Sequence, residues 1–125
     1  LLKDLVVKKG MSLIMITHSL GVARELVDRI YVMYAGNIVE VSETKELFHN
    51  PLHPYTVGLM SCVPRLSGGG VSEGIYGYIP SYINPTKGCR FYSRCSKSTE
   101  QCKIEKPPMI DINDNHRVAC FNYNK

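Results

Sequence analysis

The sequence predicts an α/β fold that ends in a small, irregular, cysteine-rich extension at residues 89–125. An amphipathic stretch at residues 1–9 precedes an apolar run at Leu13–Ile16, which is the order of a helix followed by a buried strand. A second amphipathic stretch and a β-rich run follow at residues 20–27 and 30–34. Four of the five cysteines come later, where apolar periodicity is weak.

The first two elements form a helix-then-strand unit. Apolar residues at i, i+3 and i+4 share one face of the helix expected at residues 1–9, and Gly10 is a natural helix C-terminus. The run Ser12–Thr17 is apolar at its centre without alternation, which is typical of a strand buried on both faces of a parallel sheet. We therefore expect strand 12–17 to lie in a sheet covered by helices.

A helix and a hairpin follow. The apolar positions of residues 20–27 lie on one side of a helix, which ends at Asp28. Two β-rich runs at residues 30–34 and 38–41 flank the turn Ala35-Gly36-Asn37, so we expect a β-hairpin.

Two short helices come next. Ser42 can cap a helix over residues 43–49, and the Asn50-Pro51 pair ends it. Pro54 can open another helix, which Pro64 ends.

Glycine and proline then mark the boundaries. Because Ser67-Gly68-Gly69-Gly70 is a flexible joint, we place a boundary near residue 66. The expected organisation is the C-terminal part of a larger α/β domain at residues 1–49, a helical appendage at 50–66, a linker at 67–88 and the cysteine-rich extension at 89–125.

Charge and composition argue against nucleic-acid binding and against a membrane-spanning segment. With 15 basic and 11 acidic residues and no Lys/Arg run longer than two, the chain lacks the clustered charge that nucleic-acid binding needs. The longest apolar runs fall far short of the roughly 20 residues that a membrane span requires. The chain begins without Met and directly in helical spacing, so we expect it to start inside a domain.

One polar pair, Thr17-His18, follows the apolar strand and precedes the helix. Downstream come Val32–Glu40 and then Asn50-Pro51-Leu52-His53-Pro54-Tyr55-Thr56. With these segments in this order, the sequence resembles the ATPase subunits of di- and oligopeptide (and related nickel) importers, which belong to the ATP-binding cassette family. The resemblance spans nearly all 125 residues and implies the C-terminal part of a cassette ATPase domain.

The resemblance implies that His18 is the switch histidine, which contacts the γ-phosphate of ATP. An imidazole at a strand end can donate a hydrogen bond to that phosphate and stabilise charge during phosphoryl transfer. Ser19 departs from the family, where an Asp is usual, so a local polar contact after the histidine is in doubt.

Several family motifs are absent from these 125 residues. The sequence has no Gly-x-x-x-x-Gly-Lys-Ser/Thr phosphate loop, no glutamine loop and no strand ending in Asp-Glu. The run Leu66–Gly70 is similar to the family's signature but follows His18 in place of preceding it, so we interpret it as linker. We expect the chain alone not to hydrolyse ATP, although the full-length protein would do so with Mg²⁺.

The resemblance also implies partners and a location. We expect a second nucleotide-binding subunit, transmembrane permease subunits and a cytoplasmic position on the inner face of the cell membrane. The transported substrate, peptide or nickel, is left open. We further expect the chain to self-associate, because strand 12–17 would leave an apolar face without its neighbours.

The cysteines predict a metal site. Five cysteines without an export signal favour a reducing compartment, and the four in the extension could hold zinc or an iron-sulfur cluster. Their spacing alone does not choose between the two. The resemblance favours a four-iron four-sulfur cluster, with zinc or unmetallated and disulfide-linked cysteines as alternatives. The expected ligands are Cys89, Cys95, Cys102 and Cys120.

For several other residues the sequence predicts a charge, burial or helix-capping role. Arg90, Arg94 and Arg117 could offset the negative charge of such a cluster. We expect Cys62 to be buried, and His53 to orient a helix start.

Two other functions compete. The first is a free-standing metal-binding or dimerisation module, which explains the cysteines but not residues 12–56. The second is an enzyme with His18 as general base, for which no motif supplies a nucleophile.

Overall fold

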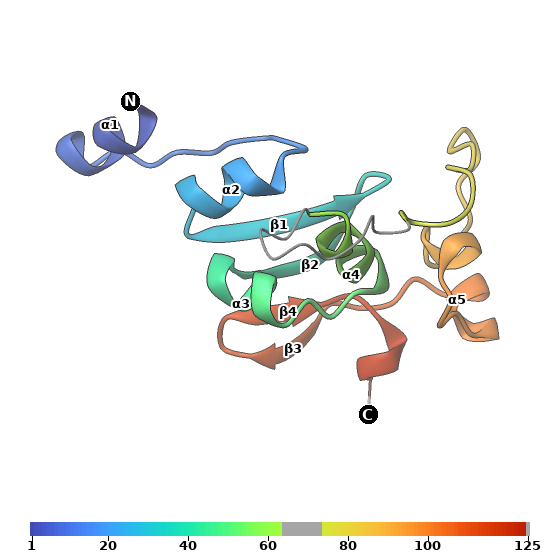
Figure 1. Cartoon of the computed structure of the whole chain (residues 1–125). Coiled ribbons are helices and arrows are strands. Elements are labelled where there is room, and N and C mark those ends of the chain that lie inside the picture. The colour runs from blue at the N-terminus through green and yellow to red at the C-terminus, as the bar shows by residue number, and fades with distance from the viewer. Residues whose placement is uncertain (64–73, 125) are drawn as a thin grey trace.

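A computed structural model describes residues 1–63 and 74–124. The boundary expected near residue 66, the Leu66–Gly70 run and the start of the linker lie outside the described residues. The elements in chain order are α1 (Leu2–Lys9), α2 (Leu20–Leu26), β1 (Arg29–Tyr34), β2 (Asn37–Glu43), α3 (Thr44–His49), α4 (Pro54–Ser61), η1 (Tyr92–Arg94), α5 (Glu100–Ile104), β3 (Ile110–Asn113), β4 (His116–Val118) and η2 (Phe121–Tyr123) (Figure 1).

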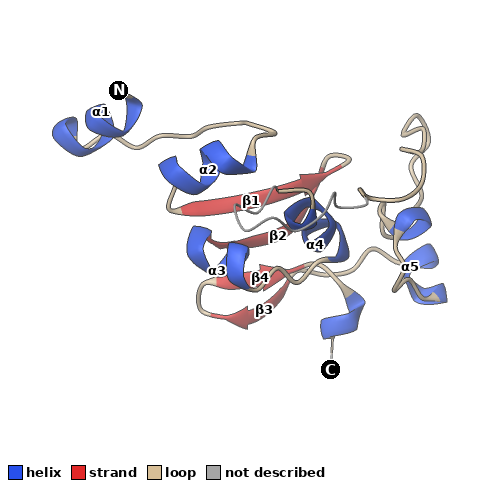
Figure 2. Ribbon diagram, viewed as in Figure 1, coloured by secondary structure: helices blue, strands red, loops and turns tan. Residues whose placement is uncertain are grey.

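Four strands form one sheet in the order β1-β2-β4-β3, and every pairing is antiparallel (Figure 2). Helices α3 and α4 pack on the face that carries Val32 and Tyr34. The α/β class is therefore confirmed, but the expected parallel arrangement is wrong.

Residues 11–17 form no strand, which corrects the strand expected at Ser12–Thr17. A strand needs a neighbour to complete its hydrogen-bond ladder, and no strand of the described residues lies beside this segment. The side chains of Ile14 and Ile16 are 94% and 98% exposed. The apolar run therefore lies in extended coil between α1 and α2, and α1 itself lies away from the sheet (Figure 1).

The hairpin is confirmed. Tyr34 pairs with Asn37, and the two residues between them, Ala35 and Gly36, have φ values of 49° and 80°. Two consecutive positive φ values are typical of a type I′ turn, whose twist matches the flanking strands. The turn therefore sets the register of the long central strand β2.

The cysteine-rich extension contributes two strands to the same sheet. Strand β4 pairs with β2, so that Val118 lies opposite Glu40 and His116 lies opposite Ser42. His116 and Val118 are both fully buried, and Arg117 between them is exposed. The extension is thus more regular than its sequence predicts, because strands of three and four residues are too short to show a clear period.

The hairpin and the extension share one core. Val32, Tyr34, Val39, Leu47 and Phe91 form its buried cluster. The ring of Phe91, from the extension, meets the ring of Tyr34 edge to face with centroids 5.1 Å apart, and Tyr55 of α4 meets Tyr34 at 4.7 Å. The extension is therefore packed against the hairpin through an aromatic contact.

Within the described residues, no helix is both long enough and apolar enough to cross a bilayer.

Candidate functional site

His18 lies on the surface. It follows the extended segment 11–17 and immediately precedes α2, whose N-cap is Ser19. The Ser19 hydroxyl accepts a hydrogen bond from the Val22 N–H at 3.4 Å, and its own N–H donates to the Thr17 hydroxyl at 3.0 Å. These two hydrogen bonds hold the backbone around His18, while the residue itself is exposed to solvent and open to an incoming ligand.

The four cysteines of the extension come together from separate places in the chain. Cys89 precedes η1, Cys95 follows it, Cys102 lies in α5, and Cys120 follows β4. Their thiolate charges are close enough to repel one another. The structure therefore places all four expected ligand residues in one region.

Backbone contacts hold two of these cysteines side by side. The Cys89 N–H donates to the Cys102 carbonyl at 2.7 Å. The preceding residue, Gly88, packs so closely that a Cβ at this position would lie 2.3 Å from the same carbonyl oxygen. Only glycine fits here, so the close approach of Cys89 to α5 depends on Gly88.

The environment raises the pKa of three thiols. Burial is the largest cause for Cys89, Cys95 and Cys120, and Coulomb repulsion from neighbouring cysteines raises the pKa of each further. The Lys97 ammonium lowers the pKa of Cys95 and Cys120 in part. Since a metal ligand must be a thiolate, binding here would displace protons and relieve the repulsion.

The three arginines that are expected to offset cluster charge all contact other polar groups of the fold. Arg90 donates to the Ala35 carbonyl, and Arg94 donates to the carbonyls of Ile75 and Tyr76 at 3.2 and 3.1 Å. Arg117 is half-exposed and lies 4.0 Å from Asp111. These side chains tie segments of the fold together, and the cation that acts on the thiols is Lys97.

No single-ion cage is formed in residues 1–63 and 74–124. In this part of the chain, no group of three or more His, Cys, Asp or Glu side chains is arranged around one possible metal position. The donor chemistry nevertheless fits a thiolate-ligated group, because four thiols share one half-buried region.

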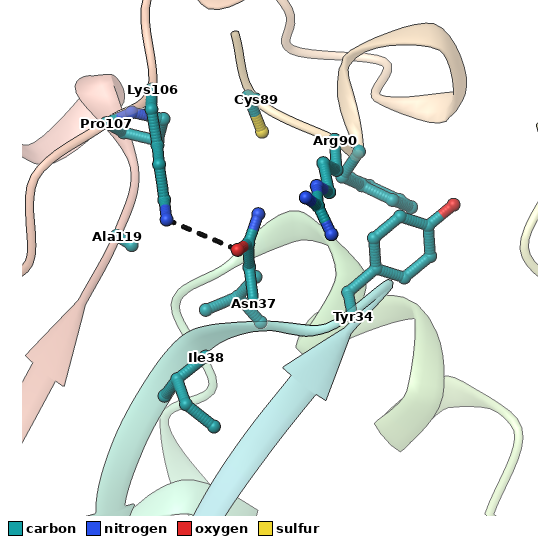
Figure 3. Close-up of a pocket in the computed structure, with 10 residues that line it drawn as sticks. Tyr34, Asn37, Ile38, Cys89, Arg90, Lys106, Pro107 and Ala119 are labelled. Atoms are coloured by element: carbon teal, nitrogen blue, oxygen red, sulfur yellow. Dashed lines mark hydrogen bonds between the residues drawn. The ribbon is translucent and has the colours of Figure 1, made fainter. Parts of the chain in front are cut away.

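A small cavity of about 20 Å³ lies between the hairpin turn and the extension (Figure 3). Cys89 and Arg90 line one side, and Lys106 reaches across to Asn37, with its Nζ 3.2 Å from the Asn37 Oδ1 (Figure 3). This volume is about that of one water molecule, so the cavity is too small for a nucleotide or a peptide.

A buried polar cluster was not predicted from the sequence. Glu40 is fully buried and lies with its Oε1 2.6 Å from the Nε2 of His116, which is equally buried. The same carboxylate accepts the N–H groups of Leu52 and His53 at 2.9 Å each. The only signal in the sequence is a single acidic residue inside an apolar strand.

His53 orients a helix start, as expected. Its Nδ1 accepts a hydrogen bond from the Tyr55 N–H at 3.1 Å and so caps α4. Burial lowers the pKa of His53 from 6.5 to about 4, so the ring is neutral at physiological pH. Cys62, by contrast, is exposed at the end of α4, and the expectation that it is buried is wrong.

Comparison with known proteins gives consistent matches. Residues 39–102 match a family described as the C-terminal region of oligopeptide/dipeptide transporters. The chain is 44% identical over 125 residues to the oligopeptide transport ATP-binding protein OppF of Haemophilus influenzae, covering 97% of this chain and 38% of that protein.

Two further relatives have similar coverage. The dipeptide transport ATP-binding protein DppD of Caldanaerobacter subterraneus subsp. tengcongensis is 43% identical, and the oligopeptide transport ATP-binding protein AppD of Bacillus subtilis is 40% identical, each over 124 residues. In both cases the match covers 98% of this chain and 38% of the relative. The chain thus spans well under half the length of the curated relatives it matches.

Proposed function

Because the chain belongs to the family of oligopeptide/dipeptide transporter C-terminal regions, we propose that it is the C-terminal part of an ATP-binding subunit that powers peptide import. The observation that carries this proposal is the identity of about 40% with named peptide-transport ATP-binding proteins over nearly the whole chain. Hydrolysis of ATP with Mg²⁺ would also require the upstream regions that make up the rest of such a subunit.

The proposal implies an assembly at the membrane. The subunit would pair with a second nucleotide-binding subunit and drive transmembrane permease subunits from the cytoplasmic face. The names of the relatives favour peptides over nickel as the transported substrate.

In this proposal His18 is the switch histidine. Its support is its position directly before α2, its exposure to solvent, and the Ser19 cap that fixes the backbone beside it. The imidazole would contact the γ-phosphate and stabilise charge in the transition state.

The direct test is His18→Ala in the full-length subunit. We expect ATP binding to be retained and the hydrolysis rate to fall by roughly 100-fold or more, because a preorganised hydrogen-bond donor is lost. ATP binding is measured by equilibrium titration, and turnover by phosphate release.

A matched control is His49→Ala. His49 is also exposed, but it lies at the end of α3, where its Nδ1 is 2.8 Å from the Lys45 carbonyl oxygen. Its substitution should leave turnover unchanged. Unchanged turnover in His18→Ala would remove the assignment of His18.

We also propose a thiolate-ligated cofactor at Cys89, Cys95, Cys102 and Cys120. Its support is that the four thiols lie close enough to raise one another's pKa, and that cysteine thiolates are the ligands of four-iron four-sulfur clusters. When bound, such a cluster would contribute a redox-active or structural centre.

Metal analysis of anaerobically prepared protein tests this cofactor. We expect iron, sulfide and a broad visible absorption band, with loading more complete at pH 8.5 than at pH 7. The pH dependence follows from the raised pKa of three thiols, which must lose their protons to bind. Iron and sulfide content and visible absorption are measured at both pH values.

Cys62→Ser is the control for the cofactor, because Cys62 is exposed and lies outside the four. It should not change loading, whereas Cys102→Ser should abolish it. Colourless protein that contains zinc would show that the cysteines bind zinc in place of a cluster. Protein that contains no metal would exclude both cofactors.

A further inference from the structure

The contact between Glu40 and His116 joins the hairpin to the extension. Both side chains are fully buried, and the Glu40 carboxylate is surrounded by three donors: the His116 Nε2 and the N–H groups of Leu52 and His53. A buried carboxylate is tolerated only when it is paired and hydrogen-bonded. Moving His116 would therefore leave Glu40 without one of its donors.

This contact distinguishes the observed register of β4 from slipped registers. A slip by one residue would turn His116 to the exposed face of the sheet. A slip by two residues would keep the same face inward but would shift the strand by about 7 Å. Neither slipped register places an imidazole beside Glu40, and β4 is too short for its apolar residues alone to set the register.

Cys120 depends on this register more than the other three cysteines do. The strand continues from Val118 into Ala119, whose N–H donates to the Val39 carbonyl at 2.8 Å, and Cys120 comes next. Cys89 is held instead by the Cys102 carbonyl, which is a contact within the extension. Only Cys120 reaches the cysteine region from the sheet.

A second contact anchors the chain after Cys120. The Tyr123 hydroxyl donates to the Leu52 carbonyl at 2.9 Å, and Leu52 also donates its N–H to Glu40. Cys120 thus lies between the contacts of β4 with β2 on one side and the contact of Tyr123 with Leu52 on the other. Glu40 takes part in both regions, through His116 and through the Leu52 N–H.

We propose that Glu40 and His116 are positioning residues of the cysteine site: their buried contact fixes the register of β4 and thereby places Cys120 beside Cys89, Cys95 and Cys102. This inference rests on the proposed cysteine site and names the residues that assemble it.

The test is the alkylation rate of each cysteine in metal-free protein, measured by mass spectrometry after timed exposure to iodoacetamide. We expect Glu40→Gln and His116→Leu to accelerate alkylation of Cys120 by about tenfold, because local opening of β4 exposes its thiol. Cys89 and Cys95 should change by less than about threefold, since contacts within the extension hold them.

Two further variants serve as controls. His116→Gln keeps an N–H donor near the position of Nε2, so alkylation of Cys120 should return close to the wild-type rate. Arg117→Gln alters the neighbouring residue on the exposed face of β4, and it should leave all four rates unchanged. If His116→Leu fails to fold, Glu40→Gln and the recovery in His116→Gln still decide the question.

Two outcomes would overturn the inference. Equal acceleration of all four cysteines would mean that the pair only stabilises the whole fold, and unchanged rates would mean that the pair does not place Cys120.

Failure of the cofactor proposal is distinguishable from failure of this inference. Wild-type protein that binds neither zinc nor a cluster would remove the cofactor, whereas the alkylation rates would still report whether Glu40 and His116 place Cys120.

Discussion

At the scale of single residues, His53 shows how burial gives one side chain a defined chemical state. Its ring accepts the Tyr55 N–H, and the ring contacts Phe91 with centroids 5.7 Å apart. An acceptor at Nδ1 must be unprotonated, so the cap on α4 exists only while the ring is neutral. Burial lowers the pKa of His53 to about 4 and so keeps it neutral.

This pKa predicts acid sensitivity. The unfolded chain takes up a proton at this histidine below pH 6.5, whereas the folded chain does so only near pH 4. The contribution to the free energy of unfolding is therefore complete above pH 6.5 and is lost as the pH falls through 4, on the order of 3 kcal/mol in total. Urea denaturation at pH 7 and pH 4.5 measures the loss.

His53→Asn isolates this effect, because asparagine can cap a helix without titrating. It should reduce the difference in stability between pH 7 and pH 4.5, whereas His49→Asn, at an exposed site, should not. An unchanged difference in His53→Asn would show that other groups cause the acid sensitivity.

At the scale of elements, the hairpin turn carries local strain. Ala35 has a φ of 49°, which is disfavoured for a residue with a Cβ and is better tolerated by asparagine. We expect Ala35→Asn to raise the free energy of unfolding by roughly 0.5–1 kcal/mol, as measured by urea denaturation. Its backbone carbonyl, which accepts from Arg90, is retained.

A control for this substitution is Asn84→Ala, at an exposed coil position outside the turn. It should change stability little. A destabilised Ala35→Asn would mean that the larger side chain disturbs the packing of Arg90 against the turn.

Local signals predicted some elements and not others. The hairpin, α3 and α4 follow from turn and proline signals within a few residues of each element, and the structure confirms them. The expectation that Ser42 caps α3 is wrong, because Ser42 lies inside β2 and Glu43 is the N-cap. The run Leu13–Ile16 has the composition of a strand but no neighbouring strand among the described residues, and composition alone cannot supply one. Strands β3 and β4 are too short to show a period.

The candidate sites, like the elements, were predicted from the sequence only in part. The four cysteines could be grouped from residue type alone, and the structure gathers them. The contact between Glu40 and His116 joins residues 76 positions apart, and nothing near either residue in the sequence indicates it. Such pairs become visible only when the strand pairing is known.

At the scale of the whole molecule, the first 17 residues expose apolar surface. Ile14 and Ile16 are almost fully exposed, and Leu1, Leu2 and Val7 add to them. Exposed patches of this kind promote association. We expect the 125-residue chain to scatter light as a species heavier than 14.1 kDa, with a mass that rises with concentration.

The double substitution Ile14→Lys and Ile16→Lys should restore the monomer, because it removes the two most exposed side chains of the run. Ser12→Lys, at a polar exposed position, is the matched control and should leave the association unchanged. A wild-type monomer whose residues 11–17 are protected from hydrogen exchange would contradict the prediction.

The placement of Phe91 bears on how this region can be engineered. Its ring belongs to the extension, yet it packs in the same buried cluster as Tyr34 and Leu47 and against the ring of Tyr55, so the hairpin's core includes a residue from a distant part of the chain. A chimera that transplants residues 89–125 onto a foreign hairpin would need to bring these contact residues with it. The two segments should therefore be exchanged between homologous proteins as one unit.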